Sequence, residues 1–207
     1  MSIIHRLKKI KNKKMVNDNI KIIEQKILSE KWYVLYNIVF DQKNKDGVWQ
    51  RVEREAYDRG NGAAILLYNK EKRTVILTSQ FRMPTYLNGN PTGMLTEVCA
   101  GLLDDLNPEE CIKKETEEET GYIVHHVQKV FQAYMSPGSV TEILHFFIAE
   151  YHENMKANEG GGVADDHENI EVLEWSFDHA LEMIKTGAIT DAKTILLLYY
   201  VKIYNIL

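Results

Sequence analysis

The sequence has few cysteines, few prolines and no long hydrophobic run. Its two cysteines, Cys99 and Cys111, are too few for a disulfide framework and favour a protein of the reducing cytoplasm. No apolar run reaches the roughly 18–20 residues that a helix needs to span a bilayer. The N-terminus also lacks the continuous apolar segment of a secretory signal. We therefore expect a cytoplasmic protein that makes no use of a membrane.

An excess of basic charge is also missing. The 25 Lys and Arg residues face 30 Asp and Glu, which gives a formal net charge of -5. Because neutralising phosphates along a nucleic acid needs a basic surface, we expect no nucleic-acid partner. Residues 1–18 are the local exception, with lysines at positions 8, 9, 11, 13 and 14. We interpret this basic run as a solvated tail, with a targeting or anion-binding arm as the alternative.

Two common site motifs are absent as well. The His and Cys residues show no zinc-ligand spacing, and no Gly-Lys-Ser/Thr loop of the phosphate-binding kind occurs. The function must therefore be sought in other residue patterns.

Hydrophobic patterning divides the rest of the chain into two regions. Residues 19–58 are expected to form a small β-rich segment, with strands near 32–40 and 48–57 joined at the hairpin signal Asp46-Gly47. Residues 59–207 form the main domain. Strands are expected there at 63–68, 74–81, 97–103, 124–134, 143–149 and 172–175, and helices at 108–120, 177–185 and 191–205. This order indicates an α/β (α+β) fold with a mixed sheet between helices.

The helix expected over 108–120 has clear signals at both ends. Asn107 suits the N-cap, and Pro108 suits the first helical position, where its missing N–H costs nothing. Glu110, three residues after Asn107, is typical of a capping box. Gly121 stands where a left-handed residue ends a helix. The boundaries of this helix are therefore the best-defined prediction in the chain.

The last turns of this helix carry an unfavourable charge pattern. Glu115 lies three and four positions before Glu118 and Glu119, so the three share a face. Repulsion between like charges costs a few tenths of a kcal/mol per pair, and the negative helix end adds about 0.3–1 kcal/mol per residue. A solvated acidic face is one interpretation. The other is a bound cation: carboxylates suit Mg²⁺, which commonly joins protein carboxylates to substrate phosphates.

The same segment resembles a known family motif. The run from Lys114 to Tyr122, Lys-Glu-Thr-Glu-Glu-Glu-Thr-Gly-Tyr, is similar to the second half of the Nudix box, Arg-Glu-U-x-Glu-Glu-x-Gly-U, where U is bulky and aliphatic. Gly101 corresponds to the first Gly of the box, although its spacing to Gly121 is one residue short. Asn107 replaces the first Glu of the box.

A second resemblance is more specific. The run Glu97-Val-Cys-Ala-Gly-Leu-Leu-Asp104 resembles the ADP-ribose pyrophosphatase branch of the Nudix hydrolases. Within that branch, the chain is most similar to bacterial enzymes that act on GDP-mannose. Segments that carry this similarity extend over about residues 19–203, which is nearly everything but the basic tail.

The resemblance implies a Nudix fold and a hydrolase that uses Mg²⁺, with Mn²⁺ as an alternative. It implies cleavage of the pyrophosphate bond of a nucleoside diphosphate sugar, with GDP-mannose giving GMP and mannose 1-phosphate as the expected reaction. One alternative is ADP-ribose, cleaved to AMP and ribose 5-phosphate. The other is a Nudix module that binds a nucleotide without cleaving it. The N-terminal strands are expected to form a homodimer and to help complete the partner's site.

Site residues follow from the same resemblance. The implied metal ligands are Glu115, Glu118, Glu119, Glu168 and the Ala100 carbonyl. Glu119 is also implied in catalysis, together with Glu168 or Asp166 from a late loop in which Asp165 is a further candidate. Gly160 to Gly162 would allow that loop to close over the substrate. The substrate contacts implied are Trp32, Glu53, Arg54, Glu55, Arg82, Ala100, Gly101, Leu102 and Glu142.

Several of these residues have a simpler explanation that the sequence leaves open. Trp32 could pack in the core of the N-terminal strands, and Glu53, Arg54 and Glu55 could form a solvated strand edge. The acids of the late loop, and Glu142, could be ordinary surface residues.

Overall fold

The computed structural model describes residues 17–162 and 169–207. Most of the basic tail, together with Asp165, Asp166 and Glu168 of the late loop, lies outside the described residues. The chain divides into two compact units, which we call the N-terminal unit (Met1–Asp58) and the C-terminal unit (Arg59–Leu207). Among the helices of the described residues, none is long and apolar enough to cross a membrane.

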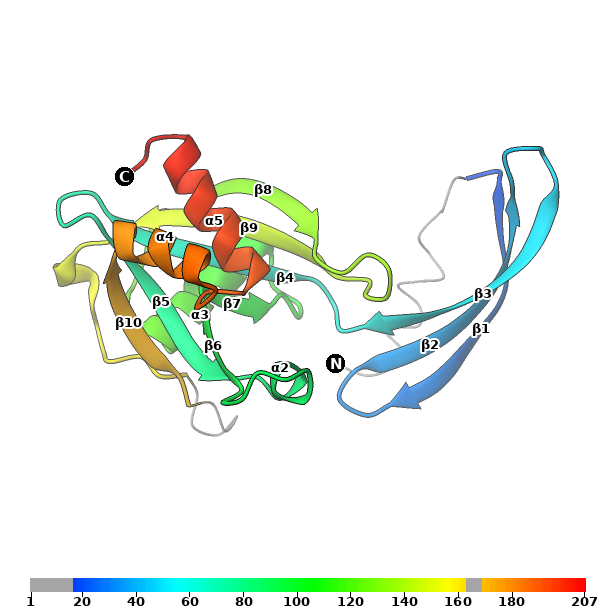
Figure 1. Ribbon diagram of the computed structural model, residues 1–207, viewed down its shortest axis with the longest axis horizontal. Coiled ribbons are helices and arrows are strands. Elements are labelled where there is room, and N and C mark those ends of the chain that lie inside the picture. The colour runs from blue at the N-terminus through cyan, green and yellow to red at the C-terminus, as the bar shows by residue number, and fades with distance from the viewer. Residues whose placement is uncertain (1–16, 163–168) are drawn as a thin grey trace. The chain divides into compact units, whose positions relative to one another are not determined.

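The N-terminal unit is a three-stranded antiparallel sheet with the strands in chain order (Figure 1). Its strands are β1 (Ile20–Glu30), β2 (Val34–Lys43) and β3 (Trp49–Asp58). The hairpin signal is confirmed: Gly47 has a φ of 80°, and the Asn44 side chain accepts hydrogen bonds from the backbone of Asp46 and Val48. The sequence predicted two strands here and missed β1. Two register shifts in β1 explain the irregular apolar pattern that hid it.

The C-terminal unit contains a seven-stranded mixed sheet. The main path is β10-β5-β4-β9-β8, with β6 paired to β5 and β7 paired to β4. Only the central pair β4 and β9 is parallel among these strands. The bounds are β4 (Gly62–Asn69), β5 (Thr74–Phe81), β6 (Met94–Glu97), β7 (Cys99–Leu102), β8 (Gln128–Tyr134), β9 (Ile143–Glu150) and β10 (Glu171–Ser176). The strand expected over 97–103 is in fact β7, preceded by β6, which ends at Glu97.

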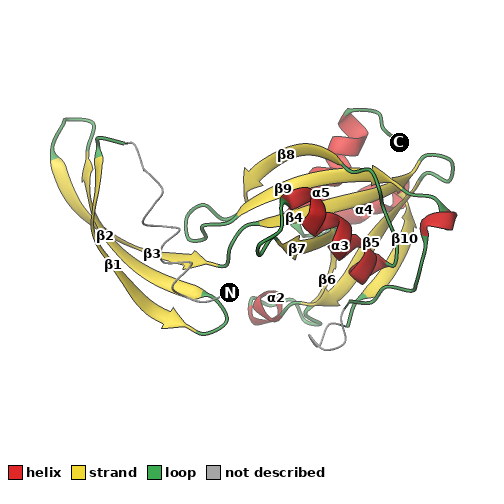
Figure 2. Cartoon of the chain, turned by 180° about the vertical axis from the view of Figure 1, so that it is seen from behind, coloured by secondary structure: helices red, strands yellow, loops and turns green. Residues whose placement is uncertain are grey.

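Helices cover both faces of this sheet. Figure 1 shows α4 and α5 in front of the sheet, and Figure 2, seen from behind, shows α3 on the opposite face. The bounds are α2 (Met83–Leu87), α3 (Pro108–Thr120), α4 (Phe177–Thr186) and α5 (Ala192–Ile203), with a short 3-10 helix at Glu153–Met155. The predicted mixed sheet between helices is confirmed.

Strand β4 lies at the centre of two hydrophobic cores, and all eight of its residues are buried. Ala64, Leu66 and Tyr68 pack in the core that includes α4 and α5. Their neighbours Ala63, Ile65 and Leu67 pack in the core that includes Ile112 of α3 and Tyr122 just after it. A strand with two buried faces reads as a continuous apolar run, as this one does.

Helix α3 begins and ends where the sequence predicted. The Asn107 side chain accepts hydrogen bonds from the backbone N–H groups of Glu109 and Glu110, 3.1 Å and 3.0 Å long. Gly121 adopts a left-handed conformation with a φ of 78°, and its N–H donates to the Glu117 carbonyl. These caps fix the position of the acidic C-terminal turns of α3.

Candidate active site

Strand β7 and helix α3 bring two residues of the predicted motif, Gly101 and Glu115, into contact. An ideal Cβ placed on Gly101 would lie only 2.1 Å from Cδ of Glu115 and 2.3 Å from its Oε1. Any side chain larger than hydrogen at Gly101 would therefore displace this carboxylate. Ala100, Gly101 and Leu102, three of the implied substrate contacts, all lie on β7, which pairs with β4 and contacts α3.

Glu119 is the most buried of the α3 carboxylates, with 4% of the residue exposed. The Cys99 thiol of β7 lies close enough that the charge of Glu119, after burial itself, raises the pKa of this thiol well above its usual value. Burial, followed by the charge of Glu115, raises the pKa of the Cys111 thiol to about 12. Both cysteines are buried, free thiols, and their raised pKa values favour the neutral form.

Glu118 has a different environment. It is half-buried, and its Oε2 accepts a 2.6 Å hydrogen bond from Lys114 one turn earlier. This pair offsets part of the repulsion that the sequence pattern indicated for the C-terminal turns. The Lys114 ammonium is more exposed than the Glu118 carboxylate, and its pKa is raised by this hydrogen bond.

The backbone of residues 157–162 is attached to the end of α3. The N–H groups of Gly161 and Gly162 donate to the carbonyls of Glu119 and Glu118, and the N–H of Ala157 donates to the carbonyl of Gly121. A Cβ on Gly160 would lie 2.5 Å from the Glu119 carbonyl oxygen. The three glycines, all with positive φ, thus allow the chain to approach the helix end closely. This contact is a reason for the glycine run that the loop-closure interpretation did not include.

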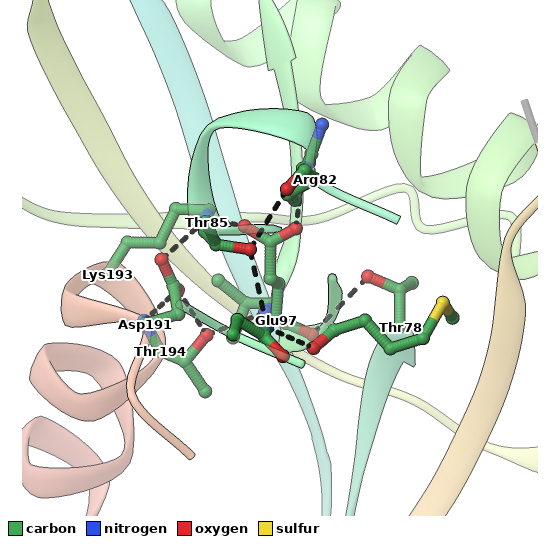
Figure 3. Close-up of polar contacts among 10 residues, drawn as sticks. Thr78, Arg82, Thr85, Glu97, Asp191, Lys193 and Thr194 are labelled. Atoms are coloured by element: carbon green, nitrogen blue, oxygen red, sulfur yellow. Dashed lines mark hydrogen bonds and ion pairs between the residues drawn. The ribbon is translucent and has the colours of Figure 1, made fainter. Parts of the chain in front are cut away.

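Arg82 lies between β5 and α2, as the N-cap residue of α2, and is held by a buried carboxylate (Figure 3). Its Nε donates a 2.6 Å hydrogen bond to Oε2 of Glu97, a residue that is only 3% exposed. The other carboxylate oxygen accepts from Lys193, which also donates a 2.8 Å hydrogen bond to Asp191. Among the described residues, Glu97 is the side-chain partner found for the Arg82 guanidinium.

Glu142 lies close to the start of β4, beside the carbonyl of Gly101 in β7. An ideal Cβ on Gly62 would meet the carbonyl oxygen of Gly101 at 3.0 Å and Oε1 of Glu142 at 3.3 Å. The Glu142 side chain is 12% exposed, and its Oε1 lies 3.7 Å from Nε of Arg59. The interpretation of Glu142 as an ordinary surface residue is therefore wrong, because its carboxylate is mostly buried.

The remaining expected contacts lie in the N-terminal unit. Trp32, in the turn between β1 and β2, is 83% exposed, so its alternative interpretation as a core residue is wrong. Glu53, Arg54 and Glu55 are exposed on β3, where Glu53 accepts a 2.6 Å hydrogen bond from Asn37. Both interpretations of these three residues therefore remain open.

The oxygen donors of α3 suit a hard divalent cation. Glu115 is half-buried against Gly101, Glu119 is buried, and the chain reaches Ala100 one residue before Gly101. Within residues 17–162 and 169–207, no three His, Cys, Asp or Glu side chains gather as a metal site. The expected further ligand, Glu168, lies outside those residues. The residues present fit such a cation in their chemistry, because carboxylate and carbonyl oxygens are the ligands that a hard divalent cation prefers.

The family resemblance assigned no function to Glu97 or Lys193. A signal for Glu97 was present: it is a charged residue between Leu95 and Val98, at the start of an otherwise apolar stretch. Asp191 and Thr194 gave no such signal, because Asp and Thr are common at the N-terminus of any helix. The contact of Thr194 with Val98 joins residues 96 positions apart and depends on the tertiary structure.

Comparison with protein families gives two matches. The family model of the NUDIX domain matches residues 58–198. A model described as the GDP-mannose pyrophosphatase NudK N-terminal domain matches residues 19–57.

Curated relatives match over nearly the whole chain. A GDP-mannose pyrophosphatase of Cronobacter sakazakii is 58% identical over 91% of this chain and 98% of the relative. One from Escherichia coli O157:H7 is 57% identical over 93% of this chain and the full length of the relative. One from Pectobacterium atrosepticum is 60% identical over 87% of this chain and 93% of the relative.

A solved structure agrees on the fold. A crystal structure of an ADP compounds hydrolase has a TM-score of 0.67 with this chain, at 17% identity, and the alignment covers 90% of this chain and 94% of that one. At that level of identity, the likeness bears on the fold alone.

Proposed function

Because the chain belongs to the Nudix family, we propose that it hydrolyses the pyrophosphate bond of GDP-mannose to give GMP and mannose 1-phosphate. Relatives that are 57–60% identical over most of the chain carry the name GDP-mannose pyrophosphatase. The observation that carries the proposal is the contact of Glu115 with Gly101, which places the acidic end of α3 directly against β7.

The residues of this site divide the work of the reaction. Glu115, Glu119 and the Ala100 carbonyl would hold a divalent cation, which Nudix pyrophosphatases generally use. When bound, this cation neutralises diphosphate charge and lowers the pKa of a water molecule. Arg82 would donate to a phosphate, for which a guanidinium has suitable geometry. One water is consumed: its oxygen forms a new bond to one phosphorus, the P–O–P bridge breaks with the bridging oxygen leaving on the other phosphate, and both protons of the water are released as the two products become dianions.

We propose Mg²⁺ as the metal, with Mn²⁺ as the alternative. Hard oxygen ligands suit both ions. Glu118 could bind a second ion through Oε1, because Lys114 donates to its other oxygen, Oε2. Glu168 and Asp166 remain the proposed acids of the late loop.

We also propose a homodimer that forms through the N-terminal unit, with Trp32, Glu53, Arg54 and Glu55 reaching the partner's substrate. Large apolar side chains on this small sheet support the proposal: Ile22, Ile23 and Leu28 are 45–49% exposed. A three-stranded sheet that leaves such side chains exposed has little core of its own. The free, buried thiols of Cys99 and Cys111 agree with a cytoplasmic location.

A phosphate-release assay tests the proposal. Purified protein with Mg²⁺ would be given GDP-mannose or ADP-ribose, with alkaline phosphatase added to release phosphate from the monophosphate products. A higher kcat/KM for GDP-mannose is expected. A higher kcat/KM for ADP-ribose would leave the proposed site residues unchanged but would make ADP-ribose the preferred substrate. Nucleotide binding without turnover in Mg²⁺ or Mn²⁺ would overturn the proposed activity.

A further inference from the structure

Glu97 is a buried carboxylate that receives two cations in fixed positions. Its Oε2 accepts the 2.6 Å hydrogen bond from Nε of Arg82, and its Oε1 accepts from Lys193. The Glu97 side chain is 3% exposed, the Lys193 side chain 15% and the Arg82 side chain 38%. Exposure thus increases from the carboxylate outward to the guanidinium, which reaches solvent.

The backbone around Glu97 is held from both sides. Glu97 pairs with Thr78 across β5 and β6, and the Thr78 hydroxyl donates to the Glu97 carbonyl at 3.3 Å. The next residue, Val98, donates its N–H to the Thr194 hydroxyl at 2.8 Å. That hydroxyl in turn donates to Asp191 at 2.6 Å. The carboxylate therefore projects from a backbone that has two independent anchors, one in the sheet and one in α5.

The direction of the Arg82 guanidinium follows from this arrangement. Because Nε is used by Glu97, the guanidinium edge formed by the two terminal nitrogens remains for another acceptor. Figure 3 shows the end of the Arg82 side chain pointing away from the Glu97 network. That edge is the one that binds a phosphate through two parallel hydrogen bonds. Lys193 occupies the other oxygen of Glu97, so the plane of the carboxylate cannot rotate freely.

The position of Glu97 in the chain relates this network to the acidic helix. Glu97 precedes Ala100 by three residues, so the two lie within about 10 Å along extended backbone. The same short segment, β6 and β7, thus carries the anchor of Arg82 and the residues next to Glu115. A shift of Glu97 would move Arg82 relative to the acidic site.

We propose that Glu97 is a positioning residue that aims the guanidinium of Arg82 at the substrate diphosphate. Glu97 itself is buried behind Arg82 and makes no substrate contact. This inference rests on the proposed function, in which Arg82 binds a phosphate. An arginine held in place loses less side-chain freedom when the phosphate binds, so the anchor strengthens substrate binding.

The test combines Glu97→Gln, Arg82→Ala and the double variant in a thermodynamic cycle. Gln keeps the size of the side chain but replaces one carboxylate oxygen by an NH₂ group. The side chain then has a single acceptor oxygen and no charge, so it cannot hold both Arg82 and Lys193. We expect Glu97→Gln to raise the KM for GDP-mannose by on the order of 10–100-fold with a smaller change in kcat. In the double variant, Glu97→Gln should add little to the effect of Arg82→Ala, because the two act on the same contact.

Glu174→Gln is the matched control. Glu174 lies on β10 and accepts a 2.8 Å hydrogen bond from the Tyr151 hydroxyl, away from Arg82. The Glu174→Gln substitution should lower Tm and leave KM unchanged, as expected for the loss of a carboxylate with a purely structural role. Glu97→Asp, which keeps the buried charge, is the second variant in case Glu97→Gln does not fold. Its shorter side chain reaches both cations less well, so we expect an intermediate KM.

Binding of inorganic pyrophosphate, measured by calorimetry with Mg²⁺ present, gives a readout that does not need turnover. Weaker binding by both Glu97→Gln and Arg82→Ala supports the inference. Weaker binding by Arg82→Ala alone, or effects of the two substitutions that add in the cycle, would overturn it and leave the proposed function standing. If Arg82→Ala changes neither pyrophosphate binding nor KM, the phosphate contact of Arg82 is wrong, and the inference falls with it.

Discussion

The two units of this chain use the same element, a sheet of apolar strands, with opposite results. In the C-terminal unit, β4 is buried over all eight residues, because helices pack on both faces of its sheet. In the N-terminal unit, seven of the ten residues of β3 are exposed and Val52, Ala56 and Asp58 are half-buried, while β1 is mostly exposed. The C-terminal unit is therefore stabilised by its own core, whereas the N-terminal unit buries Val34 and Tyr36 of β2 but leaves many of its other apolar side chains exposed.

This difference also separates the chemistry. The described carboxylates that we place in the active site, Glu115, Glu119 and Glu142, all belong to the C-terminal unit, and each is at least half-buried. The N-terminal candidates Trp32, Glu53 and Glu55 are exposed. We infer that the C-terminal unit holds the reacting groups in place, while the N-terminal unit supplies contacts that form on assembly.

The largest effect should come from Glu119→Gln. This change removes the charge of the buried carboxylate at the end of α3 and retains its volume. We expect kcat to fall by about three orders of magnitude or more, as for loss of a metal ligand, with Tm kept within a few degrees. Turnover and circular dichroism check this. Near-normal kcat would show that the metal site has been misplaced and that the proposed division between the units is wrong.

The next effect concerns stability and compares the two sheets directly. Leu66 in β4 is fully buried, so Leu66→Ala should lower the free energy of unfolding by about 2–5 kcal/mol. Ile23 in β1 is 49% exposed, so Ile23→Ala should cost less than about 1 kcal/mol in a monomer. Urea denaturation at several protein concentrations measures both. A large cost for Ile23→Ala that grows with protein concentration would identify Ile23 as an interface residue.

A smaller effect is expected for Gly101→Ala, because the new methyl group must displace the Glu115 side chain. The rest of the sheet should tolerate the change, since only the end of a side chain has to move. We expect kcat/KM to fall by on the order of 10–100-fold, with a modest loss of stability. Gly138→Ala is the control, because a Cβ there meets nothing within 4 Å. Equal effects of the two substitutions would contradict the contact with Glu115.

The smallest effect should be a pH dependence from His145. Its Nδ1 is buried with no hydrogen-bond partner among the described residues, and burial, together with the charge of Lys129, lowers the pKa of this imidazole below 6.5. His145 therefore binds a proton more readily in the unfolded chain than in the folded one. The free energy of unfolding should be highest above pH 6.5 and should decrease as the pH drops through the folded-state pKa. In His145→Gln, the change in Tm between pH 5 and pH 8 should be smaller than in the wild-type protein. The same dependence of Tm on pH in the variant would show that other groups cause it.

The sequence was most informative where local rules decide the structure. The caps at Asn107 and Gly121 fixed α3 to the residue, and strand β5 was predicted with the bounds that it has. The start of β8 was predicted four residues too early, at Val124 instead of Gln128. Register shifts hid β1, because an irregular pairing blurs the alternation of side chains.

For the site, sequence order could not reveal contacts between distant segments. Glu115 and Glu119 were identifiable from their spacing on one helix face, but the closeness of Gly101 to Glu115 depends on how α3 packs on β7. The Glu97 network joins residues that are 96 positions apart, as in the contact of Lys193 with Glu97. Such a partnership leaves no periodic signal in a single sequence.

The parallel pair at the centre of the C-terminal sheet has a consequence for synthesis of the chain. Gly62 in β4 pairs with Leu144 in β9, 82 residues later, so a ribosome must deliver most of the polypeptide before this pair can form. The strands β1 to β3, joined by short turns, can pair as soon as they emerge. Because long-range pairing is slow, nascent β4 can pair with β5 early but keeps its other edge open until β9 emerges. Slow translation should therefore favour chaperone binding at Gly62–Asn69.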